Sequence, residues 1–466
     1  MLTYNLENRG KIPLYDYLYR CIRDDILSGN IKAGDKLPSK RTLAKHLNVS
    51  IVTIENAYAQ LSLEGYIEPV EKSGYFVMKL EHTEKASCMI KQAVDEEEFE
   101  YSFFADLRSN RIRRNNFPFS TWARLLRDTV SSHNEMLLKT VPYNGIYELR
   151  LALAEFLHEY RGMNVQPSQI IIGSGTEYLY SRLIRLLGRD SIWAVESTGN
   201  QKITGIYNMY NASWKYVSGD EYGLSPNVLN KSGCNVLHVS PANHFPTGTV
   251  MPVKRRQELL SWAMQEDSRY ILEDDYDSEF RYSGAAIAPL YSMDNSGKVI
   301  YMNTFSKTLI PSLRISYMVL PPSLMERYKE ELSFYSGTVS SIEQYTLARF
   351  ISEGYFERHL NHMRNYYKNI RNSFINAIKA SPLNDISTIE EANSGTYFLL
   401  KLNTSLPDDT IATRTKAADI DVATMSEYII SGSNDTHTII INYCGVHMER
   451  IEETVRRLTK AICEST

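Results

Sequence analysis

The sequence is short of cysteine, of long apolar runs and of net charge. Its five cysteines are scattered among 466 residues without CxxC spacing, so we expect neither a zinc site nor a disulfide framework. No apolar run reaches the roughly 18 residues of a membrane span, and residues 1–9 lack the apolar region of a signal peptide. These absences predict a cytoplasmic protein. The net charge of −4 excludes a protein that is basic throughout, so any contact with nucleic acid must be local.

The length indicates more than one domain. Residues 1–79 are predicted to form a small helical unit. Residues 80–100 are predicted to be an exposed linker, because they carry the acid run Asp-Glu-Glu-Glu-Phe-Glu, although residues 86–94 could be helical. Residues 101–466 alternate apolar strands with helices, which predicts an α/β sheet covered by helices. A smaller α/β module is expected over about residues 380–466.

Within residues 101–466 one long helix, over residues 355–380, contains several histidines. His359 and His362 have a spacing that suits a metal, but no nearby cysteine or further histidine completes a ligand set. We therefore predict no metal and place both histidines on a solvated or dimer-contact face. Other helices are expected over residues 117–130, 147–160 and 177–187.

The N-terminal segment contains signals for three helices. The first is expected over residues 13–28, where apolar residues recur at four-residue spacing. The second begins after Ser39 and the third after Ser50, because serine is a favoured N-cap residue. Helix, short turn and helix is the arrangement of a helix-turn-helix motif. A small helical bundle is the alternative.

A second motif surrounds Lys307, just after an apolar strand that ends near Met302. Thr304 and Ser306 precede this lysine, and Arg314 follows it by seven positions. Hydroxyls and a guanidinium can surround a phosphate while a lysine of lowered pKa attacks a carbonyl group. A surface lysine is the alternative.

Upstream, another apolar strand over residues 270–272 leads directly into acidic residues. Taken alone, Asp274 and Asp275 would be solvated loop residues. Together with Tyr276 and Lys307, they look like parts of a pyridoxal phosphate (PLP) site. A Gly-Ser-Gly-Thr turn at residues 173–176 follows another buried strand and begins a helix, where backbone N–H groups bind anions.

These motifs in combination resemble the MocR subfamily of GntR regulators, in which a winged helix-turn-helix is fused to a domain similar to fold-type I aminotransferases. The GntR-like strings are Leu-Pro-Ser-x-Arg-x-Leu-Ala at residues 37–44, Val-Ser-x-x-Thr at 49–53, Ala-Tyr-x-x-Leu at 57–61, Glu-Gly-Tyr at 64–66 and Ser-Gly-Tyr-Phe-Val at 73–77. The match runs from about residue 14 to the C-terminus. It implies an α/β chain with an N-terminal winged helix-turn-helix, a large aminotransferase-like domain and a smaller C-terminal module.

The resemblance implies that residues 1–79 bind double-stranded operator DNA and that the protein is a homodimer. The basic run over residues 36–45 suits backbone phosphates, and the start of the third helix suits the major groove. The family usually has arginine after the second capping serine, whereas this chain has Ile51, so no guanine contact is expected there. The expected DNA-binding residues are Ser39, Lys40, Arg41, Ser50, Thr53, Asn56 and Gly74.

The resemblance also implies a PLP site. Lys307 would bond the aldehyde of PLP, and Tyr276 would hydrogen-bond its phenolic oxygen. Asp274 would keep the pyridine nitrogen protonated, with Asp275 as the second choice. The expected phosphate ligands are Ser174, Gly175, Thr176, Thr304, Ser306 and Arg314.

Four positions depart from the aminotransferase pattern. Asn200 replaces the tyrosine that stacks on the cofactor, and Phe245 replaces an asparagine that contacts its phenolic oxygen. Lys202 and Ile440 stand where relatives carry arginines for a substrate carboxylate. These replacements favour a regulator over a working enzyme. In particular, neither Lys202 nor Ile440 offers the bidentate geometry with which a guanidinium binds a carboxylate.

We therefore expect PLP itself to be the effector, as in PdxR-type regulators that control PLP synthesis, with Lys202 as the residue open to an anionic partner. Two alternatives remain: a sensor of an amino compound, and an active aminotransferase with a fused DNA-binding domain. A scaffold without cofactor is disfavoured because Asp274, Tyr276, Lys307 and Arg314 are all present.

Overall fold

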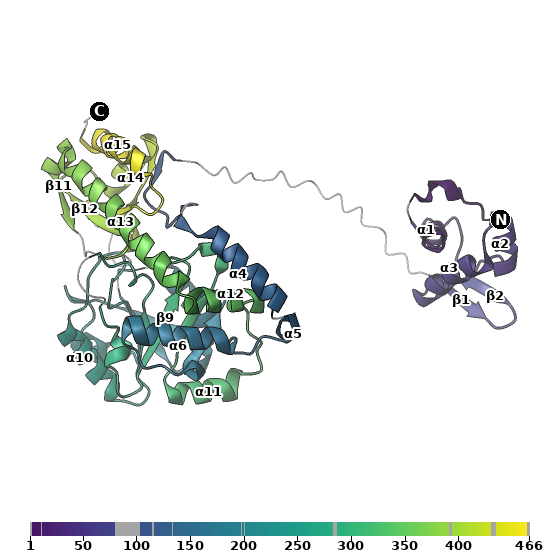
Figure 1. The fold of residues 1–466 in the computed structure, drawn as a ribbon, viewed down its shortest axis with the longest axis horizontal. Helices are drawn as coiled ribbons and strands as arrows, with labels where there is room; N and C mark the ends of the chain where they lie inside the picture. Colours follow the sequence, from purple (N-terminus) through teal and green to yellow (C-terminus); the bar gives the residue numbers. More distant parts are fainter. Residues whose placement is uncertain are drawn as a thin grey trace. The chain divides into compact units, whose positions relative to one another are not determined.

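The computed structural model describes residues 2–10, 12–79, 103–113, 116–132, 134–196, 198–199, 201–282, 287–390, 394–429 and 435–463. The chain divides into two compact units, Met1–Glu100 and Tyr101–Thr466, which are treated separately below (Figure 1). The predicted linker lies outside the described residues, as does the helix considered for residues 86–94. Within the described ranges, no helix is both long and apolar enough to cross a membrane.

The first unit is a winged helix-turn-helix, as predicted. A buried apolar core holds its three helices together. The elements are α1 (Leu14–Leu27), α2 (Lys40–Leu47), α3 (Ile51–Leu63) and an antiparallel hairpin of β1 (Ile67–Val70) and β2 (Gly74–Val77).

Both predicted capping serines begin their helices. Ser39 Oγ accepts the Thr42 N–H and Ser50 Oγ accepts the Thr53 N–H, each at 3.1 Å. Each cap satisfies a backbone donor that the first helical turn leaves without a partner. Between α2 and α3, Asn48 adopts a left-handed conformation with φ of 52°, which makes the turn tight.

The second unit is built on a seven-stranded sheet. β10 is antiparallel to both of its neighbours, and all other pairs in the sheet are parallel. In sheet order the strands are β4 (Ile170–Gly173), β10 (Ser316–Val319), β9 (Val299–Thr304), β8 (Tyr270–Asp274), β7 (Val236–Val239), β5 (Ile192–Glu196) and β6 (Ser213–Val217).

Helices cover both faces of this sheet. In β4, Ile170 and Ile172 pack in the cluster that contains α6 (Tyr147–Arg161) and α12 (Ser341–Ser352). Ile171 packs on the other face. Strands buried on both faces are apolar throughout, which is why the sequence shows runs rather than alternation. The remaining helices of this part are α4 (Phe119–Ser132), α5 (Asn134–Leu137), α7 (Thr176–Leu187), α8 (Gln201–Met209), α9 (Pro226–Ser232), α10 (Val253–Met264) and α11 (Pro322–Leu332).

A smaller module follows α13 (Tyr355–Lys379), close to the predicted boundary. Its antiparallel sheet contains, in order, β11 (Ser387–Glu390), β12 (Tyr397–Leu402), β15 (Thr438–Asn442) and β14 (Ala423–Thr424), with α14 (Asp408–Ala417) and α15 (Ile451–Cys463) packed in the same core. A separate two-stranded pairing joins β13 (Ile420–Asp421) to β3 (Ala105–Asp106).

The expectation for the histidines of α13 is wrong for one of them. His359 is buried beside Leu360 and Met363, on the apolar stripe of the helix, while His362 is exposed. A ring nitrogen of His359 lies 2.7 Å from the Thr308 carbonyl oxygen. Burial lowers the pKa of His359, so the neutral ring supports the residue next to Lys307.

Candidate functional site

The carboxyl ends of β8 and β9 open into a cavity of about 270 Å³. Asp274 is the last residue of β8, and Lys307 follows the end of β9 by three residues. Because β8 and β9 are parallel, both ends lie at the same edge of the sheet, where α/β proteins bind ligands. Six residues nominated from the sequence line the cavity: Thr176, Lys202, Asp274, Tyr276, Thr304 and Lys307.

The Lys307 amine lies between an aromatic ring and a carboxylate. Its Nζ is 4.3 Å from the centre of the Tyr276 ring and 3.9 Å from Asp277 Oδ2. The Lys307 side chain is 18% exposed, which does not fit the surface-lysine alternative. Burial raises the pKa of Asp277 to about 6, against the opposing effects of the Lys307 charge and the Asn243 amide. Sequence reasoning missed Asp277, although it follows Tyr276 in the same run.

Asp274 is held by groups that the sequence did not nominate. The Tyr180 hydroxyl donates to Asp274 Oδ2 at 2.9 Å, and His238 Nε2 lies 3.7 Å from the same oxygen. Tyr180 stands four residues after Thr176 on α7, so the helical spacing could have placed both on one face. His238 is the one ring in an otherwise apolar β7, and it gave no separate signal.

Two features of the cavity fit PLP. Asp274 Oδ1 is buried and has no hydrogen-bond partner among the described residues, so it can accept from a protonated ring nitrogen. Leaving such an atom unpaired costs about 1–3 kcal/mol. At Gly175, where φ is +91°, a Cβ would lie 2.4 Å from Arg314 Nη2. Glycine therefore lets the guanidinium approach the turn that is expected to hold the phosphate.

Of the expected phosphate ligands, Thr176 and Thr304 line the cavity, together with one unexpected acid, Glu177. Glu177 bonds both Arg314 and Lys202. The hydroxyls of Thr304 and Ser306 are 3.1 Å apart. The Ser174 N–H is engaged elsewhere, since it donates to Thr338 Oγ1 at 3.2 Å.

The substrate side is apolar at two of the departing positions. Ile440 is buried with Tyr397 and Leu399, and Phe245 and Tyr428 pack against this cluster. Asn200 lies outside the described residues. The Tyr276 hydroxyl donates to the Asn243 carbonyl oxygen at 3.0 Å, so it is already anchored to the neighbouring loop.

Asp275, the second choice for the ring-nitrogen partner, belongs to a different network. Its carboxylate forms a buried ion pair with Arg161, and it accepts hydrogen bonds from Tyr301 at 2.7 Å and from Ser278 at 2.8 Å. Asp275 does not line the cavity around Lys307. The network instead fixes the segment that follows β8 against β9.

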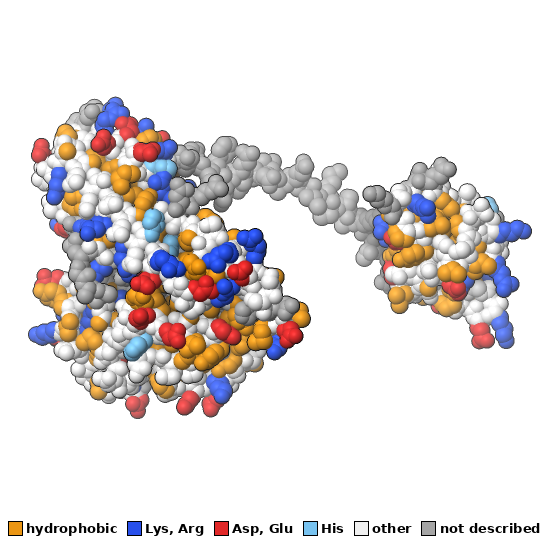
Figure 2. Space-filling model, viewed as in Figure 1, with side chains coloured by type: hydrophobic (Ala, Val, Ile, Leu, Met, Phe, Trp, Pro, Cys, Tyr) orange, Lys and Arg blue, Asp and Glu red, His pale blue; other side chains and the backbone are white. Residues whose placement is uncertain are grey.

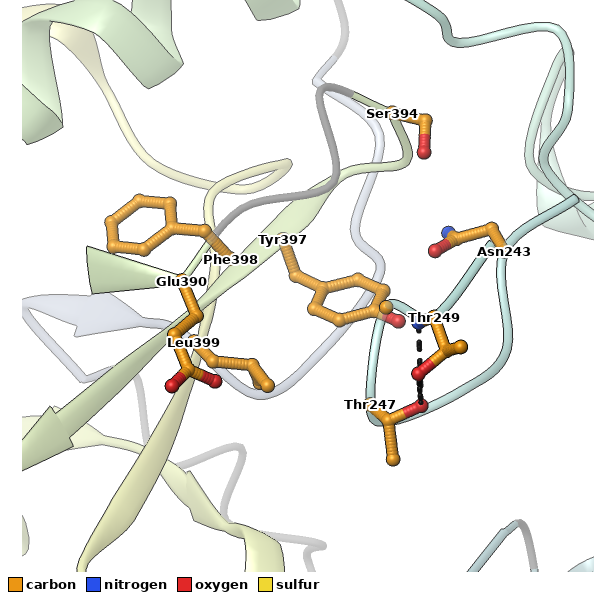
Figure 3. A pocket seen from close by; sticks show the side chains of 9 residues that line it. Asn243, Thr247, Thr249, Glu390, Ser394, Tyr397, Phe398 and Leu399 are labelled. Carbon is orange, nitrogen blue, oxygen red and sulfur yellow. Dashed lines mark hydrogen bonds between the residues drawn. The ribbon is translucent and has the colours of Figure 1, made fainter. Parts of the chain in front are cut away.

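A smaller cavity of about 140 Å³ lies between the loop of residues 243–249 and the small module (Figure 3). Figure 3 shows the Tyr397 ring reaching from β12 toward Thr247 and Thr249, whose hydroxyls are 2.9 Å apart. The Tyr397 hydroxyl donates to the His244 carbonyl oxygen at 3.2 Å. The loop therefore joins the small module to the Lys307 cavity.

In the first unit, three of the expected DNA-binding residues also make contacts within the unit. Ser39 and Ser50 cap helices, and Lys40 Nζ lies 2.6 Å from Glu55 Oε1. Figure 2 shows Lys and Arg side chains along the side formed by α2 and the hairpin, where Arg41 is exposed.

At the start of α3, apolar side chains are exposed beside the expected polar readers. Ile51 is 48% exposed and Val52 is 61% exposed, surfaces that suit thymine methyl groups. Thr53 is half-buried, Asn56 is exposed, and Gly74 in the hairpin has φ of 120°.

A helix-turn-helix unit joined to a unit with an aminotransferase fold and a lysine cavity defines a regulator of two domains. Family models agree: residues 14–77 match the bacterial regulatory proteins of the gntR family, and residues 105–458 match aminotransferase class I and II. The match to the gntR family implies DNA binding, and the match to aminotransferase class I and II implies PLP. The chain belongs to the MocR subfamily of GntR regulators.

Relatives match almost the whole chain. The uncharacterized HTH-type transcriptional regulator YdeL of Bacillus subtilis is 33% identical over 99% of both chains. The probable rhizopine catabolism regulatory protein MocR of Rhizobium meliloti is 31% identical over 98% of this chain and 95% of its own. The HTH-type pyridoxine biosynthesis transcriptional regulator PdxR of Corynebacterium glutamicum is 27% identical over 87% of both.

A solved structure supports the fold of the second unit. Kynurenine aminotransferase of Pyrococcus horikoshii aligns with a TM-score of 0.67 and 22% identity, over 78% of this chain and 91% of its own. At this identity the likeness shows the fold alone.

The buried Arg161–Asp275 pair is expected to support the whole site. Arg161→Met should destabilise the second unit by about 3–5 kcal/mol, because it leaves a buried carboxylate without its cation. Urea unfolding measured by tryptophan fluorescence checks this. Arg349→Met, at a partly exposed ion pair, is the control and should cost under about 1 kcal/mol. Equal losses for both variants would contradict the supporting role.

Variants of the first unit should distinguish residues that contribute to affinity for any DNA from residues that read the base sequence. Arg41→Ala is expected to weaken binding to every DNA sequence and to reduce the slope of log K against log salt by about 1. Asn56→Ala should weaken operator binding by about 1–3 kcal/mol more than binding to random DNA. Arg20→Ala on α1 removes the same charge away from α2 and α3 and serves as the control. Equal losses on operator and random DNA for Asn56→Ala would refute base reading by α3.

Proposed function

We propose that this chain is a transcriptional regulator that senses PLP itself and controls genes for PLP synthesis, acting as a homodimer on operator DNA without turning over an amino acid. The observation that carries the proposal is Asp274 Oδ1, a buried acceptor without a partner among the described residues, in the same cavity as Lys307. When bound, PLP supplies an aldehyde for an amine to bond and a pyridine ring that can draw electrons.

The side chains have separable roles in holding the cofactor. Asp274 would orient the ring and keep its nitrogen protonated, while the Tyr180 hydroxyl donates to its other carboxylate oxygen and His238 lies beside that oxygen. Asp277 Oδ2 stands 3.9 Å from Lys307 Nζ, whose other neighbour is the Tyr276 ring. Arg314 and Thr176 would hold the phosphate.

The absence of turnover is proposed from the substrate side. An amino acid needs a cation for its carboxylate, and Ile440 lies instead in an apolar cluster. Lys202 is engaged by Glu177. Control of PLP synthesis draws support from the name of the PdxR relative, whereas the name of the MocR relative points to a different catabolic signal.

The proposal is tested by measuring operator binding of the protein without PLP, with PLP, and with PLP plus a panel of amino acids and amines. PLP alone should change operator affinity and produce a visible absorption band that borohydride converts into a stable adduct at Lys307. Lys307→Ala should lose both the band and the response. Lys329→Ala, on the surface helix α11, is the matched control.

Three results would overturn the proposal. A response that requires an amino compound would establish an amine sensor in its place. Sustained conversion of amino acid to keto acid would establish an aminotransferase. A Lys307→Ala variant that keeps the same reducible band would remove the assigned lysine.

A further inference from the structure

Glu177 occupies the end of the cavity that is expected to hold the phosphate. Its Oε2 accepts a hydrogen bond from Arg314 Nη2 at 2.5 Å, and its Oε1 bonds Lys202 Nζ. Glu177 lies in the first turn of α7. A side-chain anion of the chain itself thus engages the donors that a phosphate would use.

The carboxylate is charged at neutral pH. Burial alone would raise the pKa of Glu177, but the hydrogen bond from Lys202 and the charges of Arg314 and Lys202 outweigh it and lower the pKa. Glu177 therefore cancels one of the two positive charges at this end of the cavity. A phosphate monoester carries a charge of about −1.5 to −2 at pH 7, so it meets a repelling charge as well as two attracting ones.

The Glu177 carboxylate and the Arg314 guanidinium both lie close to Gly175. A Cβ at Gly175 would lie 2.4 Å from Arg314 Nη2 and 2.8 Å from Glu177 Oε2. Both groups thus converge on the turn that begins α7. An anion that approaches this turn must share Arg314 with Glu177 or displace it.

We propose that Glu177 is an affinity-setting residue, whose carboxylate competes with the cofactor phosphate for Arg314 and Lys202 and thereby weakens PLP binding. This inference rests on the proposed function. A sensor responds only over the concentration range in which its site is partly filled, because ligand binding shifts a population in proportion to occupancy. By lowering affinity, Glu177 moves that range to higher PLP concentrations and lets the cofactor leave when its supply falls.

The test compares the full-length wild-type protein with Glu177→Gln, which keeps the shape of the side chain, removes its charge and leaves one oxygen to accept a hydrogen bond. PLP and pyridoxal, which lacks the phosphate, are each titrated by the visible band. Glu177→Gln should lower the Kd for PLP about tenfold, as expected for one partly screened charge near a dianion. The Kd for pyridoxal should stay within about twofold. The PLP concentration for half-maximal change in operator binding should fall by the same factor as the Kd.

Glu331→Gln is the control. Glu331 lies on α11 and pairs with Arg327, and its side chain is 46% exposed. It makes the same charge change on the surface and should alter neither Kd. An unchanged or weaker PLP affinity in Glu177→Gln would overturn the inference, and so would equal tightening of PLP and pyridoxal. If no band depends on Lys307 in either protein, the proposed function itself has failed.

Discussion

The parallel register between β8 and β9 is the constraint on which the second unit depends. Asp274 pairs in register with Met302, and Lys307 follows five residues later, beyond the end of β9. The sheet thus fixes one end of the cavity and a short turn fixes the lysine. Because backbone hydrogen bonds set this spacing, the two groups face the same space without a direct contact between them. A planar ring can then lie between a carboxylate and an amine, which is the geometry that PLP chemistry needs.

This register concentrates acids at one sheet edge, and their burial has a cost that the surrounding residues must offset. Glu273 and Glu279 are buried, and burial together with the charge of Asp275 raises the pKa of each to about 7. Arg161 is the buried cation that opposes both shifts. Its pair with Asp275 therefore offsets one of these buried negative charges, while Asp274 lines the cavity.

Local signals predicted the fold well. Serine caps, helical spacing and apolar runs are properties of neighbouring residues, and they located the helix-turn-helix, the sheet strands and α13 to within a few residues. The partners of the site were harder to predict, because Tyr180, His238 and Asn243 come from three elements distant from Lys307 in sequence. Glu177 and His359 show the same difficulty. A glutamate in a turn and a histidine on a helix are usually solvated, and only the packing of other segments decides otherwise.

The first described residues of the second unit lie close to the cavity and are joined to the small module. β3 pairs with β13 of the small module, and a few residues later Asn110 lines the cavity. Asn442, at the end of β15, donates to Asn110 Oδ1 at 2.6 Å. The segment that leads from the linker is thus hydrogen-bonded to the small module on one side and exposed to the cavity on the other. A shift of the small module must displace β3 with it, because strands joined by backbone hydrogen bonds move together.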